Sequence, residues 1–199
     1  MRTAKALAVT VSLFLALACS PRDFLTRRLA TDLISASEAF RAPQVFYLRT
    51  GVISNKDFSA PDSLVLQRRG WIIGNPAPCP VGVEPPPCWD VLLSPHGVEV
   101  FRPLMPNPTP GASLVEIRLA RRQLLEITGI SRADNNAEVE FTWHWVALNE
   151  VGTALYDNGV RYRSTVAFRK YDDGWRVTTE AVHGNQTLDE ALHNAQPAP

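Results

Sequence analysis

The segment from Glu138 to Ala147 alternates polar and apolar side chains, and this pattern restricts the fold more than any other feature of the chain. Apolar residues at every second position share one face of an extended strand, whereas a helix would scatter them around its axis. A strand with one apolar and one polar face is typical of an antiparallel sheet that covers a core on one side. The apolar positions are Val139, Phe141, Trp143, Trp145 and Ala147, and the polar ones are Glu138, Glu140, Thr142 and His144.

Turn residues on both sides of this segment indicate that it belongs to a meander of antiparallel strands. Residues 115–130 and 162–171 have the composition of neighbouring strands, and residues 134–136 and 157–159 have the Asp, Asn and Gly content of turns. Asp-Asp-Gly at residues 172–174 predicts a tight hairpin into one more short strand. The last third of the chain is therefore predicted to be mainly antiparallel sheet.

The first half of the chain predicts helices and short strands. Apolar residues recur at spacings of three and four over residues 22–40, which is typical of an amphipathic helix. A strand is expected over residues 45–50, and a second helix from Pro61 to Arg69 that ends at a glycine. Eleven of the sixteen prolines lie between residues 76 and 110, so this stretch is expected to form loops and edge strands around a hairpin-like segment at 89–101.

Two of the three cysteines, Cys79 and Cys88, flank a proline-rich loop. In an oxidising compartment such a pair is most simply a disulfide, with free thiols or a catalytic role as alternatives. No metal is expected there, because a zinc site needs about four ligands and His96 has no visible companions. The predicted fold class is thus α+β, with the N-terminal helix packed on a C-terminal antiparallel β-meander and a proline-rich middle region pinned by the disulfide.

Residues 1–19 have the basic head, apolar segment and small-residue end of a secretory leader. The apolar run Ala6–Ala18 is too short for a hydrocarbon core that needs roughly 20 residues. Cleavage after this run leaves Cys19 first, and the junction resembles the lipobox of bacterial lipoproteins. That resemblance implies a diacylglyceryl group on Cys19, and Ser20 after it implies the periplasmic side of the outer membrane. Ala16 and Ala18 also form an A-x-A cleavage site, so a freely secreted or periplasmic product is the alternative.

The predicted organisation is a signal peptide at 1–18, a single domain at 19–184 and a flexible tail at 185–199. Removal of the leader leaves 18 basic against 20 acidic residues. Nucleic-acid binding relies on clustered Lys and Arg, so this balance and the predicted export both argue against a nucleic-acid partner.

Four residues of the alternating strand are candidates for binding. Trp143 and Trp145 could form the wall of a ligand pocket, although such a stripe more often packs in a core. Glu140 and His144 lie four residues apart on the polar face, where they could bind a ligand or simply face solvent. No motif for a hydrolase nucleophile, a metalloprotease, a P-loop or a dinucleotide site occurs, so no catalytic residue, cofactor or metal is predicted.

Short motifs carry two further resemblances. Residues 64–72 and 92–97, L-V-L-Q-R-R-G-W-I and L-L-S-P-H-G, look like the helix end and first wing strand of winged-helix regulators. More globally, G-W-I, L-S-P-x-G, E-I-T-G-I at 126–130 and the strand E-V-E-F-T-W-H-W are similar to small exported bacterial lipoproteins. The meander with a packed helix also resembles the cystatin-like and NTF2-like folds, which implies a curved sheet around a helix.

The sequence therefore predicts an exported domain that is held at the membrane by a lipid on Cys19. Its expected role is non-enzymatic: binding a protein partner of the cell envelope, or helping assembly. The alternative is a small-ligand carrier or an NTF2-like enzyme that uses an aromatic-lined pocket at Trp143 and Trp145.

Overall fold

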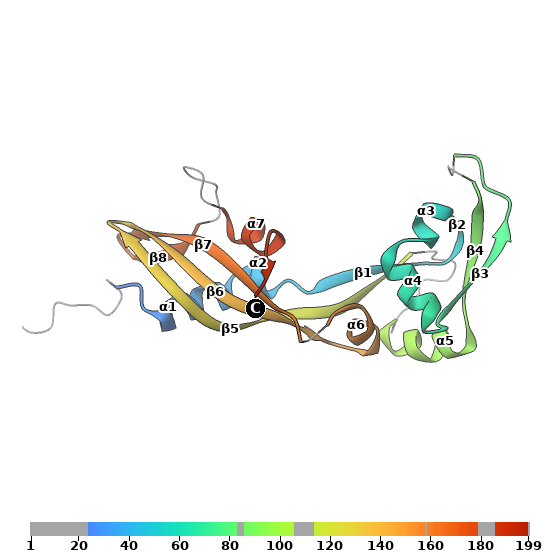
Figure 1. Cartoon of the computed structure of the whole chain (residues 1–199), viewed down its shortest axis with the longest axis horizontal. Coiled ribbons are helices and arrows are strands. Elements are labelled where there is room, and N and C mark those ends of the chain that lie inside the picture. The colour runs from blue at the N-terminus through green and yellow to red at the C-terminus, as the bar shows by residue number, and fades with distance from the viewer. Residues whose placement is uncertain (1–23, 83–85, 106–113, 158, 179–185, 199) are drawn as a thin grey trace, which may run out of the picture.

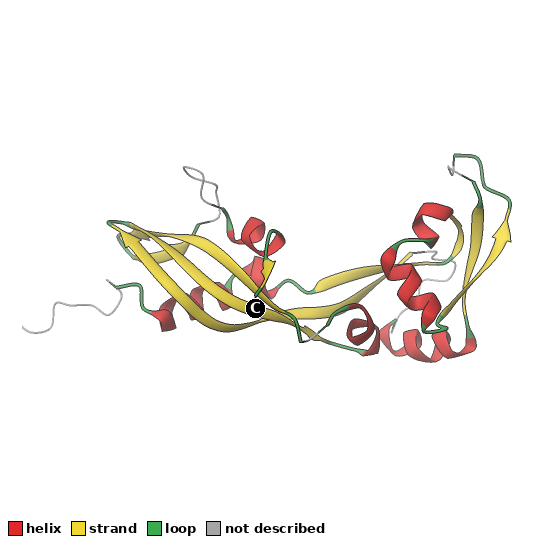
Figure 2. Cartoon of the chain, viewed as in Figure 1, coloured by secondary structure: helices red, strands yellow, loops and turns green. Residues whose placement is uncertain are grey.

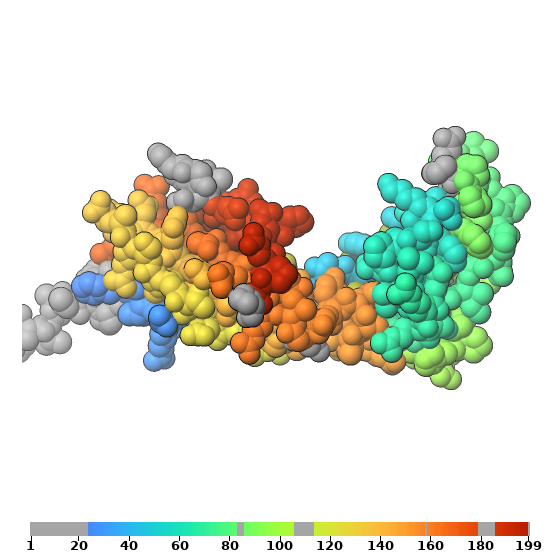
Figure 3. Space-filling view, viewed as in Figure 1, coloured from blue at the N-terminus to red at the C-terminus, as the bar shows by residue number. Residues whose placement is uncertain are grey.

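Two antiparallel sheets lie toward opposite ends of an elongated molecule (Figure 1). The computed structural model describes residues 24–82, 86–105, 114–157, 159–178 and 186–198. Figure 2 shows helices at both ends and long strands between them, and the space-filling view in Figure 3 shows two broader ends joined by a narrower middle. The predicted mixture of helices with antiparallel sheets is confirmed.

The larger sheet has six strands in the order β1-β5-β6-β7-β8, with β9 paired to β7. Strand β5 has 20 residues. At about 3.3 Å per residue it spans roughly 65 Å, which far exceeds an ordinary strand. It therefore sets the long axis of the molecule. The strands are β1 Gln44–Arg49, β5 Leu114–Ala133, β6 Asn136–Ala147, β7 Arg161–Tyr171, β8 Gly174–Val177 and β9 Gln196–Pro197.

The alternating segment forms β6, and its burial alternates as the sequence predicts. Val139 and Phe141 are fully buried, whereas Glu138 is exposed. Neighbouring β5 is irregular, with register shifts at Leu124/Glu126 and Ile127/Gly129. Such bulges bend a strand and increase its twist, so the sheet curves where these shifts occur.

The smaller sheet and its helices form the small-sheet lobe, defined as residues 51–104 with 83–85 not described. Its three strands run in the order β2-β4-β3. Strands β3 and β4 form an antiparallel hairpin that follows helix α4. The elements are β2 Gly51–Ser54, α3 Asn55–Phe58, α4 Pro61–Arg68, β3 Ile72–Ala77, β4 Cys88–Leu93, α5 Pro95–Phe101 and the 3-10 helix η1 Arg102–Leu104.

The hairpin-like segment predicted at 89–101 is wrong in its second half, which is helix α5. Ser94 ends the strand because its side chain accepts a hydrogen bond from the backbone N–H of Gly97 and so caps the helix. Pro95 occupies the first helical turn, where its missing N–H has no consequence. Ser-Pro thus acts here as a helix start.

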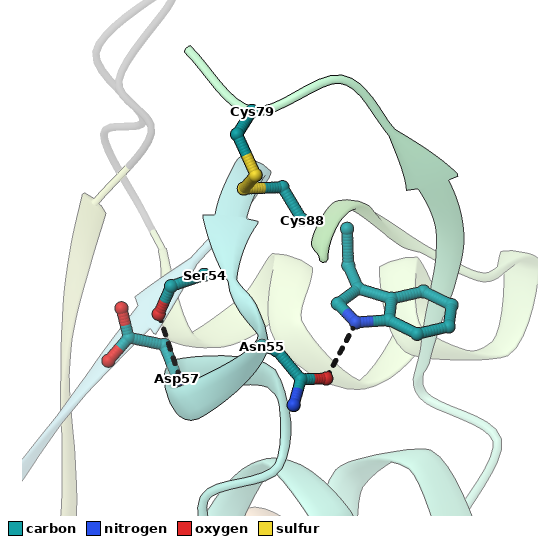
Figure 4. The surroundings of a disulfide bond; sticks show 6 residues. Ser54, Asn55, Asp57, Cys79 and Cys88 are labelled. Atoms are coloured by element: carbon teal, nitrogen blue, oxygen red, sulfur yellow. Dashed lines mark hydrogen bonds between the residues drawn. A yellow bond between two sulfur atoms is a disulfide. The ribbon is translucent and has the colours of Figure 1, made fainter. Parts of the chain in front are cut away.

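The predicted disulfide between Cys79 and Cys88 is confirmed, with a Cα–Cα distance of 5.1 Å. It closes the chain between β3 and β4 at the tip of the small-sheet lobe (Figure 4). Trp89, the next residue of β4, donates a 2.9 Å hydrogen bond from its indole Nε1 to Oδ1 of Asn55 at the start of α3. The proline-rich loop is thereby tied to the helices of the same lobe.

The range predicted as one helix at 22–40 contains two in its described part, α1 Arg27–Ala36 and α2 Glu38–Arg41. The break falls at Ser37, whose side chain accepts from the N–H of Phe40 and starts the second helix. Ala30 and Ile34 are fully buried where α1 contacts β5. Residues 22 and 23 lie outside the described residues.

The segment between β6 and β7 contains helix α6 Glu150–Leu155, with Val151 fully buried. The described part of the predicted tail at 185–199 contains a helix and a short strand. Helix α7 Leu188–His193 begins with a capping box from Thr187 and Glu190, and β9 pairs with β7 after it. The buried side chains that hold α7 to the sheet are Leu188, Ala191 and Leu192.

The predicted leader, including Cys19, lies outside the described residues. Among the helices that are described, none is long and apolar enough to cross a membrane. Buried side chains of both sheets belong to one hydrophobic cluster.

Candidate functional site

Four aromatic side chains and one arginine form a cluster on the core face of the larger sheet. Trp143 and Trp145 of β6 are 2% and 8% exposed. Tyr162 of β7 stacks on Trp143 with ring centroids 4.8 Å apart, and the two tryptophans meet edge to face at 5.2 Å. Tyr156, which follows α6, lies 5.2 Å from Trp145. We call these residues, together with Arg122, the aromatic cluster.

Arg122 of β5 lies over both tryptophans. Its guanidinium carbon is 4.7 Å from the ring centroid of Trp145 and 5.6 Å from that of Trp143, distances typical of cation–π contacts. One terminal nitrogen donates a 3.0 Å hydrogen bond to the carbonyl of Ala39 in α2. Within the described residues, its Nε is buried without a hydrogen-bond partner. The arginine therefore joins the sheet to a helix and fills the space beside the tryptophans.

Burial affects the titration of two cluster residues. Desolvation lowers the pKa of Arg122, and the charge of Asp189 on α7 raises it again in part. Arginine side chains keep their proton in proteins, so Arg122 remains a cation at neutral pH. Desolvation, with a further contribution from Asp62, raises the pKa of Tyr156 above its usual value. Tyr156 is thus a neutral phenol that cannot act as a base near neutral pH.

The polar atom of Trp143 is satisfied within the protein. Its Nε1 donates a 3.0 Å hydrogen bond to Oγ of Ser164, which in turn donates a 2.8 Å bond to the carbonyl of Ala191. This relay links β6, β7 and α7. Because Phe141 of the same stripe packs edge to face on Phe40 at 6.4 Å, the stripe is covered by helices of this chain. The aromatic face therefore has the contacts of a protein core.

Glu140 and His144 lie on the opposite, polar face of β6, so the structure separates them from Trp143 and Trp145. Glu140 Oε1 accepts from Thr128 Oγ1 at 3.1 Å and lies 3.4 Å from Nε of Arg163. His144 Nε2 lies 3.3 Å from Oε1 of Gln123. The exposed ion pair between Glu140 and Arg163 contributes under about 1 kcal/mol. The four candidate residues thus form two separate groups.

His96 and His193 lie on helices α5 and α7, away from β6. His96 lies 3.8 Å from Glu99 one turn further along α5, with both side chains exposed. His193 ends α7, and His183 lies outside the described residues. The part of the chain that the structure describes contains no group of three potential metal ligands.

Sequence reasoning missed an apolar patch on the small-sheet lobe. Ile73 and Leu92 lie directly opposite each other on β3 and β4 and are 48% and 49% exposed; Val52 on β2 points to the same side. The other side packs on helices, where Trp89 stacks on Phe58 at 4.7 Å. We call the exposed side the outer face. The sequence signal for this face is two runs of adjacent apolar residues, at 71–73 and 91–93. Because neighbouring residues on a strand point to opposite faces, each run places apolar side chains on both faces of the sheet.

A second missed feature lies where β7 turns into β8. Arg169 and Arg176 are cross-strand neighbours, with guanidinium carbons 5.6 and 5.1 Å from the ring centroid of Tyr171. Tyr171 is 46% exposed, and Arg176 forms an ion pair with Asp173. These residues line an open groove of about 900 Å³ that also includes the turn at 134–136. We call Arg169, Tyr171 and Arg176 the hairpin patch.

Comparison of the chain with protein-family models, curated proteins and solved structures gave no match.

Proposed function

We propose that this chain is an exported, lipid-anchored protein of the cell envelope with a non-enzymatic binding or assembly role. Its α+β domain, with the N-terminal helix packed on the meander, is held by a diacylglyceryl group on Cys19 to the periplasmic side of the outer membrane. The leader supports the anchor, and the observation that supports binding is the outer face. It exposes Val52, Ile73 and Leu92 together on one sheet.

The outer face has the character of a protein contact. Contiguous apolar side chains rimmed by polar residues mark interaction sites, because each square ångström removed from water contributes about 25 cal/mol. The lobe that carries this face lies at the opposite end of the molecule from α1 (Figure 1). We infer a protein partner of the envelope that covers the outer face with apolar side chains of its own.

The contacts of the aromatic cluster favour this role over the small-ligand carrier or NTF2-like enzyme. A ligand wall needs aromatic faces that are open to a cavity. Here Tyr162 and Arg122 occupy the faces of Trp143, and Tyr156 lies against Trp145. The cluster therefore supports a structural role for Trp143 and Trp145.

Replacement of Cys19 by alanine is expected to release the protein from the membrane. The wild-type protein should sediment with outer-membrane vesicles and carry the mass of its lipid in native mass spectrometry, whereas the Cys19→Ala variant should be soluble. Ser20→Ala is the matched control, because it keeps the thiol. An unmodified wild-type Cys19 recovered in the soluble fraction would defeat the anchor.

A photo-crosslinking residue at Leu92 is expected to join one discrete partner in intact cells. Leu125 on β5, which is 40% exposed against 49% for Leu92, is the matched control position and should give no adduct. An adduct only at position 92 supports the outer face as the binding surface. No adduct at position 92, or the same adducts at both positions, rejects it.

A further inference from the structure

We propose that the hairpin patch docks on the phospholipid headgroups of the membrane in which Cys19 is anchored, through phosphate bound by Arg169 and Arg176. This inference rests on the proposed lipid anchor and specifies which surface of the protein faces the bilayer. Three observations support it: the length of chain between anchor and fold, the place where the fold begins, and the chemistry of the patch.

The tether between the anchor and the described fold is short. Five peptide units separate Cys19 from Phe24. A fully extended chain spans at most about 3.6 Å per residue, so Phe24 lies within roughly 18 Å of the lipidated residue. Whichever part of the molecule surrounds Phe24 is therefore held near the headgroups.

The fold begins at the same end as the hairpin patch. The carbonyl of Leu25 accepts a hydrogen bond from the guanidinium of Arg132, which lies next to the last residue of β5. Helix α1 also contacts β8, the strand that carries Arg176. Figure 1 shows the start of α1 and the β7–β8 turn together at one end, with the small-sheet lobe at the other.

The hairpin patch has the chemistry of a phosphate site. Two like charges placed directly opposite on paired strands repel each other, and the ring of Tyr171 and the exposed ion pair of Arg176 with Asp173 offset part of this repulsion. Each guanidinium presents a planar fork of donors that matches a phosphate group. A phosphate accepted by Arg169 and Arg176 would neutralise the pair.

Exposed aromatic residues at this end fit the same surface. Tyr171 is 46% and Phe24 58% exposed. Tyrosine is enriched at membrane interfaces, because its ring enters the apolar boundary while its hydroxyl stays with the headgroups. Arg169 and Arg176 are thus accompanied by side chains that the interface also favours.

Nearby carboxylates limit the range of this attraction. Asp134, Asp172 and Asp173 also line the groove, so the end of the sheet carries both signs of charge. Attraction from bulk solution is consequently weak. A short tether supplies an effective concentration in the millimolar range, at which weak headgroup contacts are populated. Docking thus depends on the anchor. In the docked state, the small-sheet lobe and its outer face lie away from the bilayer, at the other end of a strand of roughly 65 Å.

The test measures the distance of two spin labels from the membrane. Asp172→Cys places a label in the β7–β8 turn, and Leu92→Cys places one on the outer face; both positions are exposed, and the native disulfide and the lipidated Cys19 leave one reactive thiol. The lipidated protein is reconstituted into vesicles of phosphatidylethanolamine and phosphatidylglycerol that contain a nickel-chelating lipid. The nickel at the membrane surface should strongly broaden the spectrum of the spin label at position 172 and leave that of the label at position 92 unchanged. Equal broadening at both positions overturns the proposal.

A second comparison separates headgroup binding from tethering alone. The pair Arg169→Gln and Arg176→Gln is expected to reduce broadening at position 172 several-fold. The matched pair Arg161→Gln and Arg163→Gln, from exposed positions of the same strand, should leave it unchanged. Vesicles of uncharged galactolipid, which lacks phosphate, should also lose the contact. Added inorganic phosphate tests whether the patch also recognises the free ion, because the free ion would then release the patch from the headgroups. Broadening that persists in the first pair or on galactolipid overturns the proposal.

The two levels of inference fail in different ways. If Cys19 carries no lipid, the protein is absent from the vesicles and its mass reports the unmodified residue. If the anchor is present but the hairpin patch does not dock, the protein remains on the vesicles and the label at position 172 is as remote as that at position 92.

Discussion

Replacement of Trp143 by alanine is expected to lower the free energy of unfolding by about 3 to 5 kcal/mol. The side chain is 2% exposed and contacts Tyr162, Trp145 and Arg122, so its loss leaves a cavity between elements that cannot all close. It also removes the hydrogen bond from Nε1 to Ser164. Urea unfolding followed by far-UV circular dichroism measures this change.

Two controls apportion the effect. Trp143→Phe keeps most of the buried ring and loses the N–H, so a smaller loss is expected, and combining it with Ser164→Ala isolates the hydrogen bond in a double-mutant cycle. In the wild-type protein, the tryptophans of the cluster should resist quenching by acrylamide. A stable Trp143→Ala variant, together with fluorescence that responds to an added small molecule, would instead favour the ligand-pocket alternative.

The sequence predicted the sheet well where burial has a regular period. In β6 every apolar side chain from Val139 to Trp145 lies on the core face, because β6 pairs with β7 without a register shift and one side of the sheet is covered by helices. The disulfide could also be predicted from the sequence, because two cysteines that flank a proline-rich loop most simply pair with each other in an oxidising compartment. Local pattern and tertiary structure agree in these parts.

Prediction failed where a tertiary contact or a cap outweighs the local pattern. The period-two rule breaks in β5 where consecutive Leu119 and Ala120 are both buried, at a register shift in the pairing with β1, so the core position of Arg122 could not be read from alternation. In the C-terminal segment, burial of Leu188 and Leu192 against the sheet is a tertiary contact that the local sequence pattern does not show. The hairpin patch was missed although its hairpin was predicted, because Arg169 and Arg176 are seven residues apart and become neighbours only through the register of the β7–β8 pairing.

Gly97→Ala is expected to destabilise the small-sheet lobe by about 3 kcal/mol or more. A Cβ on Gly97 would lie 1.9 Å from the backbone oxygen of Trp71, so the chain itself would have to move. The same oxygen accepts from the N–H of Ser94 at 3.0 Å. The hydroxyl of Ser94 bonds both to the carbonyl of Gly70 at 2.5 Å and to the N–H of Gly97 at 2.8 Å. The alanine therefore disrupts the junction that joins α4, β3 and α5.

Hydrogen exchange resolved along the chain measures this loss where it occurs. Protection over residues 51–104 should fall roughly 100-fold in Gly97→Ala, while β6 and β7 keep theirs if the larger sheet opens separately from the lobe. Gly129→Ala is the matched control, because its Cβ would meet only Glu140 Cβ at an ordinary 3.7 Å. Unchanged protection in Gly97→Ala would mean that α5 can shift away from Trp71, and the Ser-Pro-His-Gly segment would then have no structural need for glycine. Loss of protection across both sheets would instead show that they unfold as one cooperative unit, which would explain why a single hydrophobic cluster extends through both.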